Sequence, residues 1–372
     1  MRVTPTTALS KDPAVAGFAD MVRARAPADL PAGAIVAVVL CHNEALRLPY
    51  FLEHHRQIGV SHFYIVDNGS TDGTAELLKS QADVTHLYTT APYAKYKSHW
   101  RHVIADMVCE SKWTVFIDVD ELLIFPGWPR RSLQDYCGEQ EACGRTAAVA
   151  VMVDMYPREP LAHHRYEPGT SFIASAPFFD TGNYYILPKK RRTLARWPCP
   201  SFKISGGARV RLFHQPNNAL NKSVQRKILT KRFRWNPKIL ETAQNSLVDW
   251  PLFHLLHAVT PRHGLPNMCK VPLIRWQRGI RFSGGVHGIN QFASISKTPI
   301  TLLHFKYFGD FAEKVEVAIA RRQHSEGAFH YSVYRDRLES LLHQSLVDRV
   351  SRRYEGPSSL QDEGLLGGEN GP

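Results

Sequence analysis

Residues 113–122 read WTVFIDVDEL, an apolar run of five residues followed directly by a group of acidic ones. The run Trp113–Ile117 is rich in β-branched and aromatic side chains, which is typical of a strand buried on both faces. Asp118 and Asp120 follow it two positions apart, so in an extended backbone both side chains point to the same side. The segment therefore predicts a buried strand that ends in a pair of carboxylates.

Apolar runs and helical periods alternate on both sides of this segment. Strands that alternate with helices over short links are typical of a parallel sheet covered by helices. We therefore predict an α/β fold with a mostly parallel sheet flanked by helices. The predicted strands are 34–41, 63–66, 84–88, 113–117, 147–155 and 300–305, and the predicted helices are 44–58, 75–80, 95–110 and 311–322.

A polar stretch follows each of three predicted strands, at 41–44, 67–70 and 118–120. The carboxyl ends of parallel strands gather at one edge of a sheet, so we expect these three stretches to meet there. Two of them also have a purely structural interpretation. Residues 67–73 contain the turn-forming pairs Asn-Gly and Asp-Gly, and Glu44 carries a charge that suits a helix N-terminus.

Asp118 and Asp120 form the pair of carboxylates that most favours a bound cation. Two such groups repel each other unless positive charge lies between them. Oxygen ligands suit Mg²⁺ or Mn²⁺, and an ion of this kind bridges the phosphates of a nucleotide. The pattern therefore predicts a divalent-metal and nucleotide site, with an acidic surface turn or a helix cap as the structural alternative.

The length and composition are those of an ordinary globular protein. The 372 residues, 44% hydrophobic and 22% charged, predict a flexible arm at 1–32, one domain at 33–354 and a disordered tail at 355–372. Six widely spaced cysteines without a Cys-x-x-Cys pair favour reduced thiols. The apolar run 34–41 is too short to span a membrane and no secretory signal is recognised, so we expect a cytoplasmic protein.

The net charge of +12 comes from one part of the chain. Residues 181–240, here called the basic block, contain 15 lysines and arginines and no acidic residue. Such a block favours an anionic partner: a nucleic acid, an acidic membrane surface or a phosphorylated substrate. Peripheral contact of residues 189–234 with the inner face of a membrane is one expectation, and a solvated basic face is the structural alternative.

Three segments carry a resemblance to a known family. They read Cys-His-Asn-Glu-Ala at 41–45, Val-Asp-Asn-Gly-Ser-Thr-Asp-Gly-Thr at 66–74 and Phe-Ile-Asp-Val-Asp-Glu-Leu at 116–122. They resemble the bacterial family-2-like glycosyltransferases, in particular the branch whose aspartate motif continues as Asp-Glu-Leu. The resemblance is specific over about 34–125 and extends to the segments 270–275, 285–287 and 303–306.

The resemblance implies a GT-A fold, with a nucleotide-binding half at 33–125 and an acceptor-side α+β half at 126–354. It also implies a hexosyltransferase-like enzyme that moves a sugar from a nucleotide-sugar donor to a glycan, a lipid-linked molecule or another hydroxyl acceptor. The expected chemistry is inversion by direct displacement. A carboxylate takes the acceptor proton while Mn²⁺ or Mg²⁺ offsets charge on the departing nucleotide diphosphate.

The resemblance also implies, position by position, which side chains meet the nucleotide. Asn43 and Glu44 would lie beside the nucleobase, and Asp67, next to Asn68, would meet the base or the ribose. Asp118 would approach the ribose or the metal ion. These five residues are the expected nucleotide-binding set.

The metal ligands implied by the resemblance come from two distant parts of the chain. Asp120 would be a direct ligand, beside Asp118, and folds of this kind often add a histidine from a late loop. His304, at the end of an apolar run, is the first choice for that ligand, and His287 is the alternate. A structural histidine is an equal alternative at both positions.

The catalytic base is expected downstream of the aspartate motif. Asp180 is the last carboxylate before the long acid-free stretch and is the first candidate, with Asp154 as the second. An ordinary turn aspartate is the structural alternative for Asp180. The basic block, together with Arg275 or Lys306, is expected to help hold the donor diphosphate or an anionic acceptor.

Two other classes of function would use the same residues differently. A nucleic-acid-binding protein would use the basic block, with Phe202, Phe213, Phe233 and Trp235 as stacking surfaces. No known nucleic-acid module is recognised, so nucleic acid is not an expected partner. A metal-dependent nucleotidyltransferase or nuclease would use the same aspartates. Glycosyl transfer is therefore the preferred hypothesis.

Overall fold

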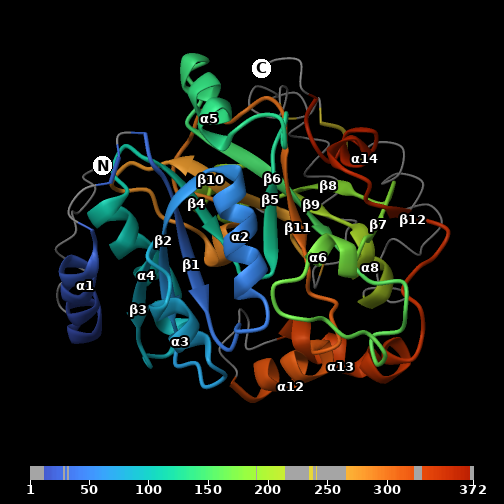
Figure 1. The fold of residues 1–372 in the computed structure, drawn as a ribbon. Coiled ribbons are helices and arrows are strands. Elements are labelled where there is room, and N and C mark those ends of the chain that lie inside the picture. The colour runs from blue at the N-terminus through green and yellow to red at the C-terminus, as the bar shows by residue number, and fades with distance from the viewer. Residues whose placement is uncertain are drawn as a thin grey trace.

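The computed structural model describes residues 12–27, 30–31, 33–189, 191–213, 234–237, 240, 265–321 and 329–368. Its centre is a curled eight-stranded sheet flanked by helices, with the strand order β3-β2-β1-β4-β10-β6-β11-β5 (Figure 1). This mixed α/β architecture confirms the predicted fold class and is consistent with a GT-A-like fold. The strands are β1 (Ile35–Cys41), β2 (Val60–Asp67), β3 (Val84–Tyr88), β4 (Trp113–Ile117), β5 (Glu121–Ile124), β6 (Ala147–Asp154), β10 (Cys269–Arg275) and β11 (Ile300–His304).

Strands β3, β2, β1 and β4 are all parallel, as the alternation of strands and helices predicts. Every residue of β1 and β4 is buried, which suits their continuous apolar sequences. The linking helices α2 (Leu48–Ile58), α3 (Thr74–Lys79) and α4 (Tyr93–Val108) lie close to the predicted ranges. Strands β1, β2 and β4 therefore end at one edge of the sheet, here called the carboxyl edge.

The other four strands run in mixed directions. Strand β10 is antiparallel to both β4 and β6, β11 is parallel to β6, and β5 is antiparallel to β11. Only residues 118–120 separate β4 from β5 in the chain, although three strands lie between them in the sheet. The sheet must therefore curl until its last strand approaches the end of β4.

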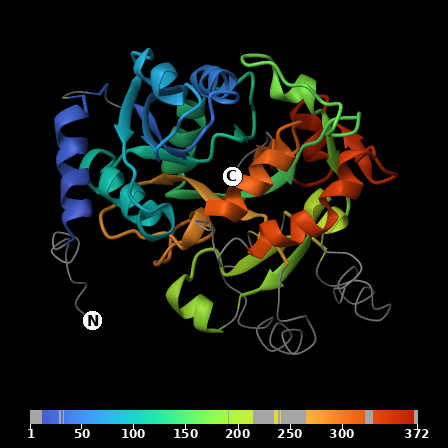
Figure 2. The same ribbon diagram turned by 90° about the horizontal axis from the view of Figure 1, so that it is seen from below.

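Two small sheets and several helices belong to the later half. Strand β7 (Phe178–Asp180) pairs with β12 (Ser351–Arg353), and β8 (Tyr185–Pro188) pairs with β9 (Phe202–Ser205). Helix α12 lies along the carboxyl edge, beneath the ends of β1 and β2 (Figures 1 and 2). Before the C-terminal segment, the described helices of this half are α5 (Leu133–Ala142), α6 (Phe172–Ser175), α7 (Arg191–Arg196), α8 (Gly207–Phe213), α12 (Phe311–Arg321) and α13 (Phe329–Leu342), with a 3-10 turn at Gly284–Val286.

The described parts of the expected flexible arm and disordered tail each contain a helix. Helix α1 (Pro13–Arg25) packs on α4, with Phe18 against Trp100. Helix α14 (Pro357–Gln361) buries Leu360 completely. These segments are rich in Ala, Pro and Gly, but they also contain apolar side chains at helical spacing. Those side chains pack against the rest of the protein and are buried. In α1 these side chains are Val15, Phe18 and Val22.

All six cysteines are free, and five of them are buried. Among the described helices, none combines the length and the apolar character that crossing a membrane requires.

Candidate functional site at the carboxyl edge

The three polar stretches that follow β1, β2 and β4 meet at the carboxyl edge, as predicted. Cys41 pairs in register with Asp67, and Val39 pairs with Ile117, so the strands end close to the same level. The residues after each strand therefore share one edge of the sheet. The site is built from these stretches and from the ends of β6 and β11.

Hydrogen bonds join the stretches after β1 and β2. The Asn43 N–H donates to Ser70 Oγ, and the Thr71 N–H donates to Asn43 Oδ1, each at 2.9 Å. The Glu44 N–H donates to Thr74 Oγ1 at 2.9 Å. Asn43 has a φ of 54°, a left-handed conformation that asparagine adopts more readily than most residues. Asn43 therefore builds the edge, and its side-chain oxygen is already bound by the neighbouring turn.

Asp67 is fully buried at the end of β2. Its Oδ1 accepts a hydrogen bond from the Ser70 N–H at 2.9 Å, and its Oδ2 lies 3.4 Å from His86 Nε2. Burial raises the pKa of Asp67, but the hydrogen bonds from His86 and Ser70 outweigh burial and hold it below its usual value. Asn68 beside it donates to two carbonyls of residues 89–91. Both residues thus have structural partners at the position predicted to face the nucleotide.

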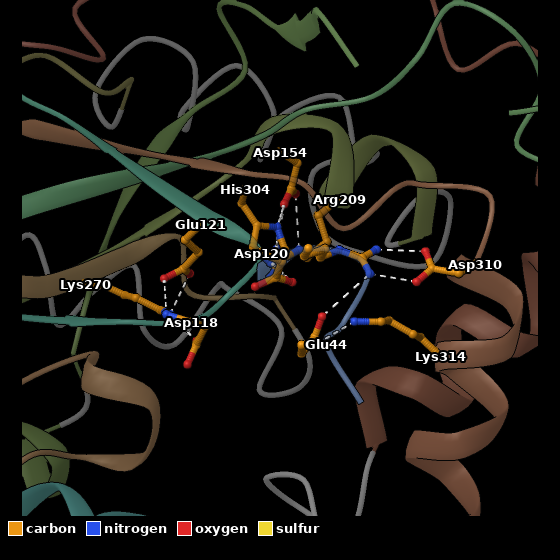
Figure 3. Close-up of polar contacts among 11 residues, drawn as sticks. Glu44, Asp118, Asp120, Glu121, Asp154, Arg209, Lys270, His304, Asp310 and Lys314 are labelled. Atoms are coloured by element: carbon orange, nitrogen blue, oxygen red, sulfur yellow. Dashed lines mark hydrogen bonds and ion pairs between the residues drawn. The ribbon is translucent and has the colours of Figure 1, made fainter. Parts of the chain in front are cut away.

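Asp120 and His304 lie against each other at the end of the sheet (Figure 3). His304 Nε2 is 3.2 Å from Asp120 Oδ2, and His304 Nδ1 is 2.7 Å from Asp154 Oδ1. Asp154 ends β6 and pairs in register with His304 at the end of β11. Arg209 of α8 donates two hydrogen bonds to Asp154, at 2.6 and 3.2 Å. We call these four residues the His304 cluster.

Opposite charges dominate the ionisation of the His304 cluster. Burial raises the pKa of Asp120, but His304 outweighs it and holds that pKa well below its usual value. Burial lowers the pKa of His304, yet the carboxylates of Asp120 and Asp154 outweigh burial and raise it. Burial likewise raises the pKa of Asp154, and the charge of Arg209 reverses that shift. Both carboxylates are therefore ionised at neutral pH.

Asp120 and His304 have the spacing of two neighbouring ligands of one divalent ion. Mg²⁺ holds octahedral ligands at about 2.0–2.1 Å, which places adjacent ligand atoms roughly 3 Å apart. The separation of 3.2 Å suits that geometry, and a carboxylate such as Asp154 commonly fixes a ligating imidazole through its other nitrogen. In the described part of the chain, no group of three or more His, Cys, Asp or Glu could hold a metal. An ion held by this pair would need further ligands, such as substrate phosphates and water.

Asp118, which is expected to share a cation with Asp120, has two cationic side chains as its partners. Its carboxylate accepts hydrogen bonds from Lys270 Nζ at 2.7 Å and from Arg101 Nη2 at 3.2 Å. Lys270 also binds Glu121 at 2.6 Å, so its ammonium lies between two carboxylates (Figure 3). The backbone turns here, since the Glu121 N–H donates to the Asp118 carbonyl. The alternation of an extended strand therefore ends before Asp120.

Helix α12 and the residue before it bind the stretch after β1. Lys314 Nζ donates to Glu44 Oε1, and Asp310 accepts two hydrogen bonds from the buried Arg47, at 2.7 and 2.8 Å. The other oxygen of Glu44, Oε2, is buried without a hydrogen-bond partner among the described residues, with Arg47 Nη1 3.7 Å away. Burial raises the pKa of Glu44 in spite of Lys314 and Arg47. This oxygen can still accept a hydrogen bond, at the edge where the nucleotide is expected.

Two residues predicted near the site have partners elsewhere. His287 Nδ1 lies 2.7 Å from the Cys269 carbonyl, and burial lowers the pKa of His287 to about 3. Arg275 pairs in register with Trp113, the first residue of β4, and so lies at the opposite edge of the sheet. There it binds Glu141 at 2.6 Å. The prediction that Arg275 helps to hold the donor diphosphate at the carboxyl edge is therefore wrong, because β10 runs antiparallel to β4.

Lys306, the other predicted diphosphate contact, stays close to the His304 cluster. It follows β11 by two residues, and its Nζ lies 4.5 Å from the ring centroid of Tyr334. Burial, helped by the charge of Arg209, lowers the pKa of Lys306 to about 7. Lys306 therefore keeps its predicted neighbourhood.

Neither aspartate expected as the catalytic base is open to an acceptor. Asp180 is fully buried and accepts two hydrogen bonds from Arg211, each at 2.8 Å, and one from the Tyr156 hydroxyl at 2.6 Å. Asp154 is also fully buried and is bound by His304. A base must reach the proton that it removes. Asp180 therefore serves as an anchor of the β7–β12 sheet, and Asp154 orients His304.

Asp180→Asn is expected to weaken the fold rather than the chemistry. The substitution leaves the Arg211 guanidinium, whose side chain is 16% exposed, without its carboxylate. Removing one partner of a buried ion pair costs about 3–5 kcal/mol, which urea unfolding of parent and variant would measure. Asp20→Asn, in the exposed pair with Arg23, is the matched control and should leave the midpoint unchanged. A stable Asp180→Asn protein that binds donor without transferring sugar would restore Asp180 as the base.

Sequence reasoning missed the cationic partners of the site. Lys270 is 152 positions from Asp118 along the chain, and Lys314 is 270 positions from Glu44. The chain has 46 lysines and arginines, and no local pattern marks those that reach the carboxyl edge. One signal was present, because Lys270 begins the segment 270–275 that also resembles the glycosyltransferases.

Much of the basic block, Phe233 included, lies outside the described residues. Of the other aromatic residues considered as stacking surfaces, Phe202, Phe213 and Trp235 are all buried. Buried rings cannot stack on the bases of a nucleic acid. The described part of the block therefore does not favour a nucleic-acid surface.

Comparisons with known proteins bear on this geometry. Residues 40–139 match the family model of glycosyltransferase family 92. A glycosyltransferase family 92 protein of Oryza sativa subsp. japonica is 32% identical over 99 residues, which are 26% of this chain and 17% of the rice protein. The chain thus spans less than a fifth of that relative. A solved "Crystal Structure of a Mycobacterial Protein" is 17% identical over 38% of this chain and 45% of its own, with a TM-score of 0.23 that supports no argument.

The matched segment runs from the end of β1 into α5 and contains all three polar stretches of the carboxyl edge. It stops before Asp154, Lys270 and His304. The motifs resemble the family-2-like glycosyltransferases, whereas the matching family model is that of glycosyltransferase family 92. Both are families of glycosyltransferases. The comparisons therefore support a relationship to glycosyltransferases, and over residues 40–139 the chain is similar to glycosyltransferase family 92.

Proposed function

We propose that this protein is a glycosyltransferase that binds a nucleotide-sugar donor at the carboxyl edge and transfers the sugar to a hydroxyl acceptor, with inversion. The observation that carries the proposal is the meeting of Asp120 and His304, 3.2 Å apart, beside the stretches that follow β1 and β2. The similarity of residues 40–139 to glycosyltransferase family 92 supports this reaction class.

The carboxyl edge offers acceptors to a nucleoside. Oε2 of Glu44 accepts no hydrogen bond from the described residues, and 15% of the Glu44 side chain is exposed, so this carboxylate suits a donor group of the base or the ribose. Asp118 keeps 36% of its side chain exposed, although Lys270 and Arg101 bind its oxygens, so it can still approach a ribose hydroxyl. Asp67 and Asn68, being buried, hold the turn at 67–70 in place. Recognition of the nucleoside is thus assigned to Glu44 and Asp118.

A divalent ion is part of the proposal. Held by Asp120 and His304, Mn²⁺ or Mg²⁺ would offset the charge on the departing nucleotide diphosphate. The chain's own residues prepare this position: Asp154 holds the imidazole of His304, and Arg209 holds Asp154. Lys314 adds positive charge close to Asp120. These groups are positioned before the donor arrives, so little reorganisation is needed during the reaction.

A screen of nucleotide sugars tests this function. Each nucleotide sugar is added with and without Mn²⁺, and both thermal unfolding and release of the nucleotide diphosphate are measured. We expect one nucleotide sugar to stabilise the protein in the presence of Mn²⁺, by about 2.7 kcal/mol at a hundred times its Kd. Chelation of Mn²⁺ should remove both the stabilisation and the hydrolysis.

The contrary result is equally clear. Absence of any response to the nucleotide sugars, together with nucleic-acid binding that falls steeply with salt, would reject the glycosyltransferase. If the stabilisation persisted after chelation, the proposed glycosyltransferase activity would stand and the proposed role of the divalent ion would be rejected.

A further inference from the structure

A cavity of about 480 Å³ lies against α4, apart from the His304 cluster. We call it the α4–α7 cavity, because residues of both helices contribute to it. Its walls combine aromatic and cationic side chains, and the residues lining it in the described structure include no acidic one. The lining side chains that matter here are His99, His102, Arg196, Trp197, Arg281 and Phe282.

One wall of the α4–α7 cavity is aromatic and rigid. The rings of His102 and Phe282 are stacked, with centroids 6.0 Å apart and an interplanar angle of 19°. The Phe282 N–H donates to His102 Nε2 at 2.9 Å, so this nitrogen is an acceptor and the imidazole is neutral. The backbone at Trp197 is fixed, because its carbonyl accepts a hydrogen bond from the buried Lys189 at 3.2 Å. The cavity therefore presents apolar ring surfaces that do not depend on a ligand.

The cations of the cavity come from two separate segments. Arg281 is held in place by Asp106 at 3.0 Å and by the Ile280 carbonyl at 2.7 Å. Arg196 is exposed at the end of α7, and its guanidinium lies 5.3 Å from the ring centroid of Trp197. A guanidinium binds carboxylate or phosphate through two parallel hydrogen bonds, which gives geometry as well as charge.

Helix α4 and strand β4 connect the cavity with the carboxyl edge. Arg101 binds Asp118 there, and the next residue of α4, His102, lines the cavity. On the other wall, Phe282 packs on Phe116 of β4, with ring centroids 4.7 Å apart. Helix α4 and strand β4 are therefore shared by the two sites.

We propose that the α4–α7 cavity binds an anionic carbohydrate, a sugar bearing a carboxylate or a phosphate, as a part of the acceptor that does not itself react. The term acceptor rests on the proposed function. Ring faces of Trp197 and Phe282 suit the apolar face of a sugar ring, and Arg196 and Arg281 suit its anionic group. A neutral glycan would bring no negative charge to either guanidinium, and Arg281 would keep Asp106 as its only anionic partner among the described residues. The donor's phosphates have their own place at the carboxyl edge, beside Asp120.

Calorimetric titration of the full chain tests the proposal with three probes: cellobiuronate, which carries one carboxylate, its neutral counterpart cellobiose, and UDP. We expect cellobiuronate to bind at least tenfold more tightly than cellobiose. Arg196→Gln should weaken cellobiuronate at least tenfold and leave UDP unchanged. Arg192→Gln is the matched control, since Arg192 is an exposed arginine of the same helix that does not line the cavity, and it should change the affinity less than twofold.

Trp197→Ala provides a second variant, and it should weaken cellobiuronate without affecting UDP. Equal affinities for the two disaccharides, or equal losses in Arg196→Gln and Arg192→Gln, would overturn the proposal. If Arg196→Gln lost as much affinity for UDP as for cellobiuronate, the proposal would also be overturned, because the cavity would then bind the phosphates of the donor. If the protein bound cellobiuronate but responded to no nucleotide, the anionic-carbohydrate site would be supported and the proposed function would be rejected.

Discussion

Asp120→Asn is expected to lower kcat/KM for the nucleotide sugar by at least about 1,000-fold, or about 4 kcal/mol of transition-state stabilisation. Asparagine has the shape of aspartate but lacks the negative charge that a divalent ion requires. His304 keeps Asp154 as its partner in the variant, so the fold should remain. Steady-state kinetics with Mn²⁺, alongside circular dichroism, measures both parts of this expectation.

Asp118→Asn is the informative comparison for Asp120. Both oxygens of Asp118 are bound by Lys270 and Arg101, so this variant should keep its response to Mn²⁺ while losing some affinity for the nucleoside. Equal loss of the Mn²⁺ response in both variants would return Asp118 to the metal site. An Asp120→Asn protein with unchanged affinity for Mn²⁺ and donor would remove the metal assignment altogether.

Lys270→Met is expected to cause the largest loss of stability at the site, about 3–5 kcal/mol. The ammonium of Lys270 lies 2.7 Å from Asp118 and 2.6 Å from Glu121, and Glu121 is fully buried. Burial lowers the pKa of Lys270, but the two carboxylates outweigh burial and raise it, so the group is charged at neutral pH. Methionine of similar length would leave Glu121 as a buried charge without compensation. Urea unfolding of variant and parent measures the loss.

A double-mutant cycle separates this electrostatic cause from lost packing. Glu121→Gln in the Lys270→Met background removes the uncompensated charge and should recover part of the stability, so the two effects should not add. Lys95→Met is the control, because Lys95 is exposed and its substitution should change little. A Lys270→Met protein within about 1 kcal/mol of the parent would show that the ammonium does not compensate the two acids.

The first half of the fold could be predicted because its signals are local. The apolar runs of β1 and β4 are continuous, and the helices between the strands have their own periods. Parallel pairing follows from that alternation, so the meeting of Glu44, Asp67 and Asp118 at one edge could also be predicted. The later half carries no such alternation. The antiparallel course of β10 therefore went unforeseen, and Arg275 was expected at the wrong edge.

The candidate site was predicted less completely than the fold. Asp120 and His304 were correctly expected to lie close together. Asp180 was expected as the base because it precedes the acid-free stretch, a criterion that contains no information about burial. In the structure, Arg211 lies 31 positions later in the chain and donates a hydrogen bond to each carboxylate oxygen of Asp180. The sequence alone does not distinguish an aspartate that binds a substrate from one that is paired with a buried arginine.

The sequence by itself determined the strands and helices of the first half and the polar residues that end three of those strands. These properties depend on neighbours within a few residues, through side-chain alternation and helical period. Only the tertiary structure decided which charges pair: Lys270 with Asp118 and Glu121, and His304 with Asp120. Strand order and the curl of the sheet bring together side chains that are more than 100 positions apart in the chain. The residues next to a charged side chain do not indicate which distant charge will pair with it.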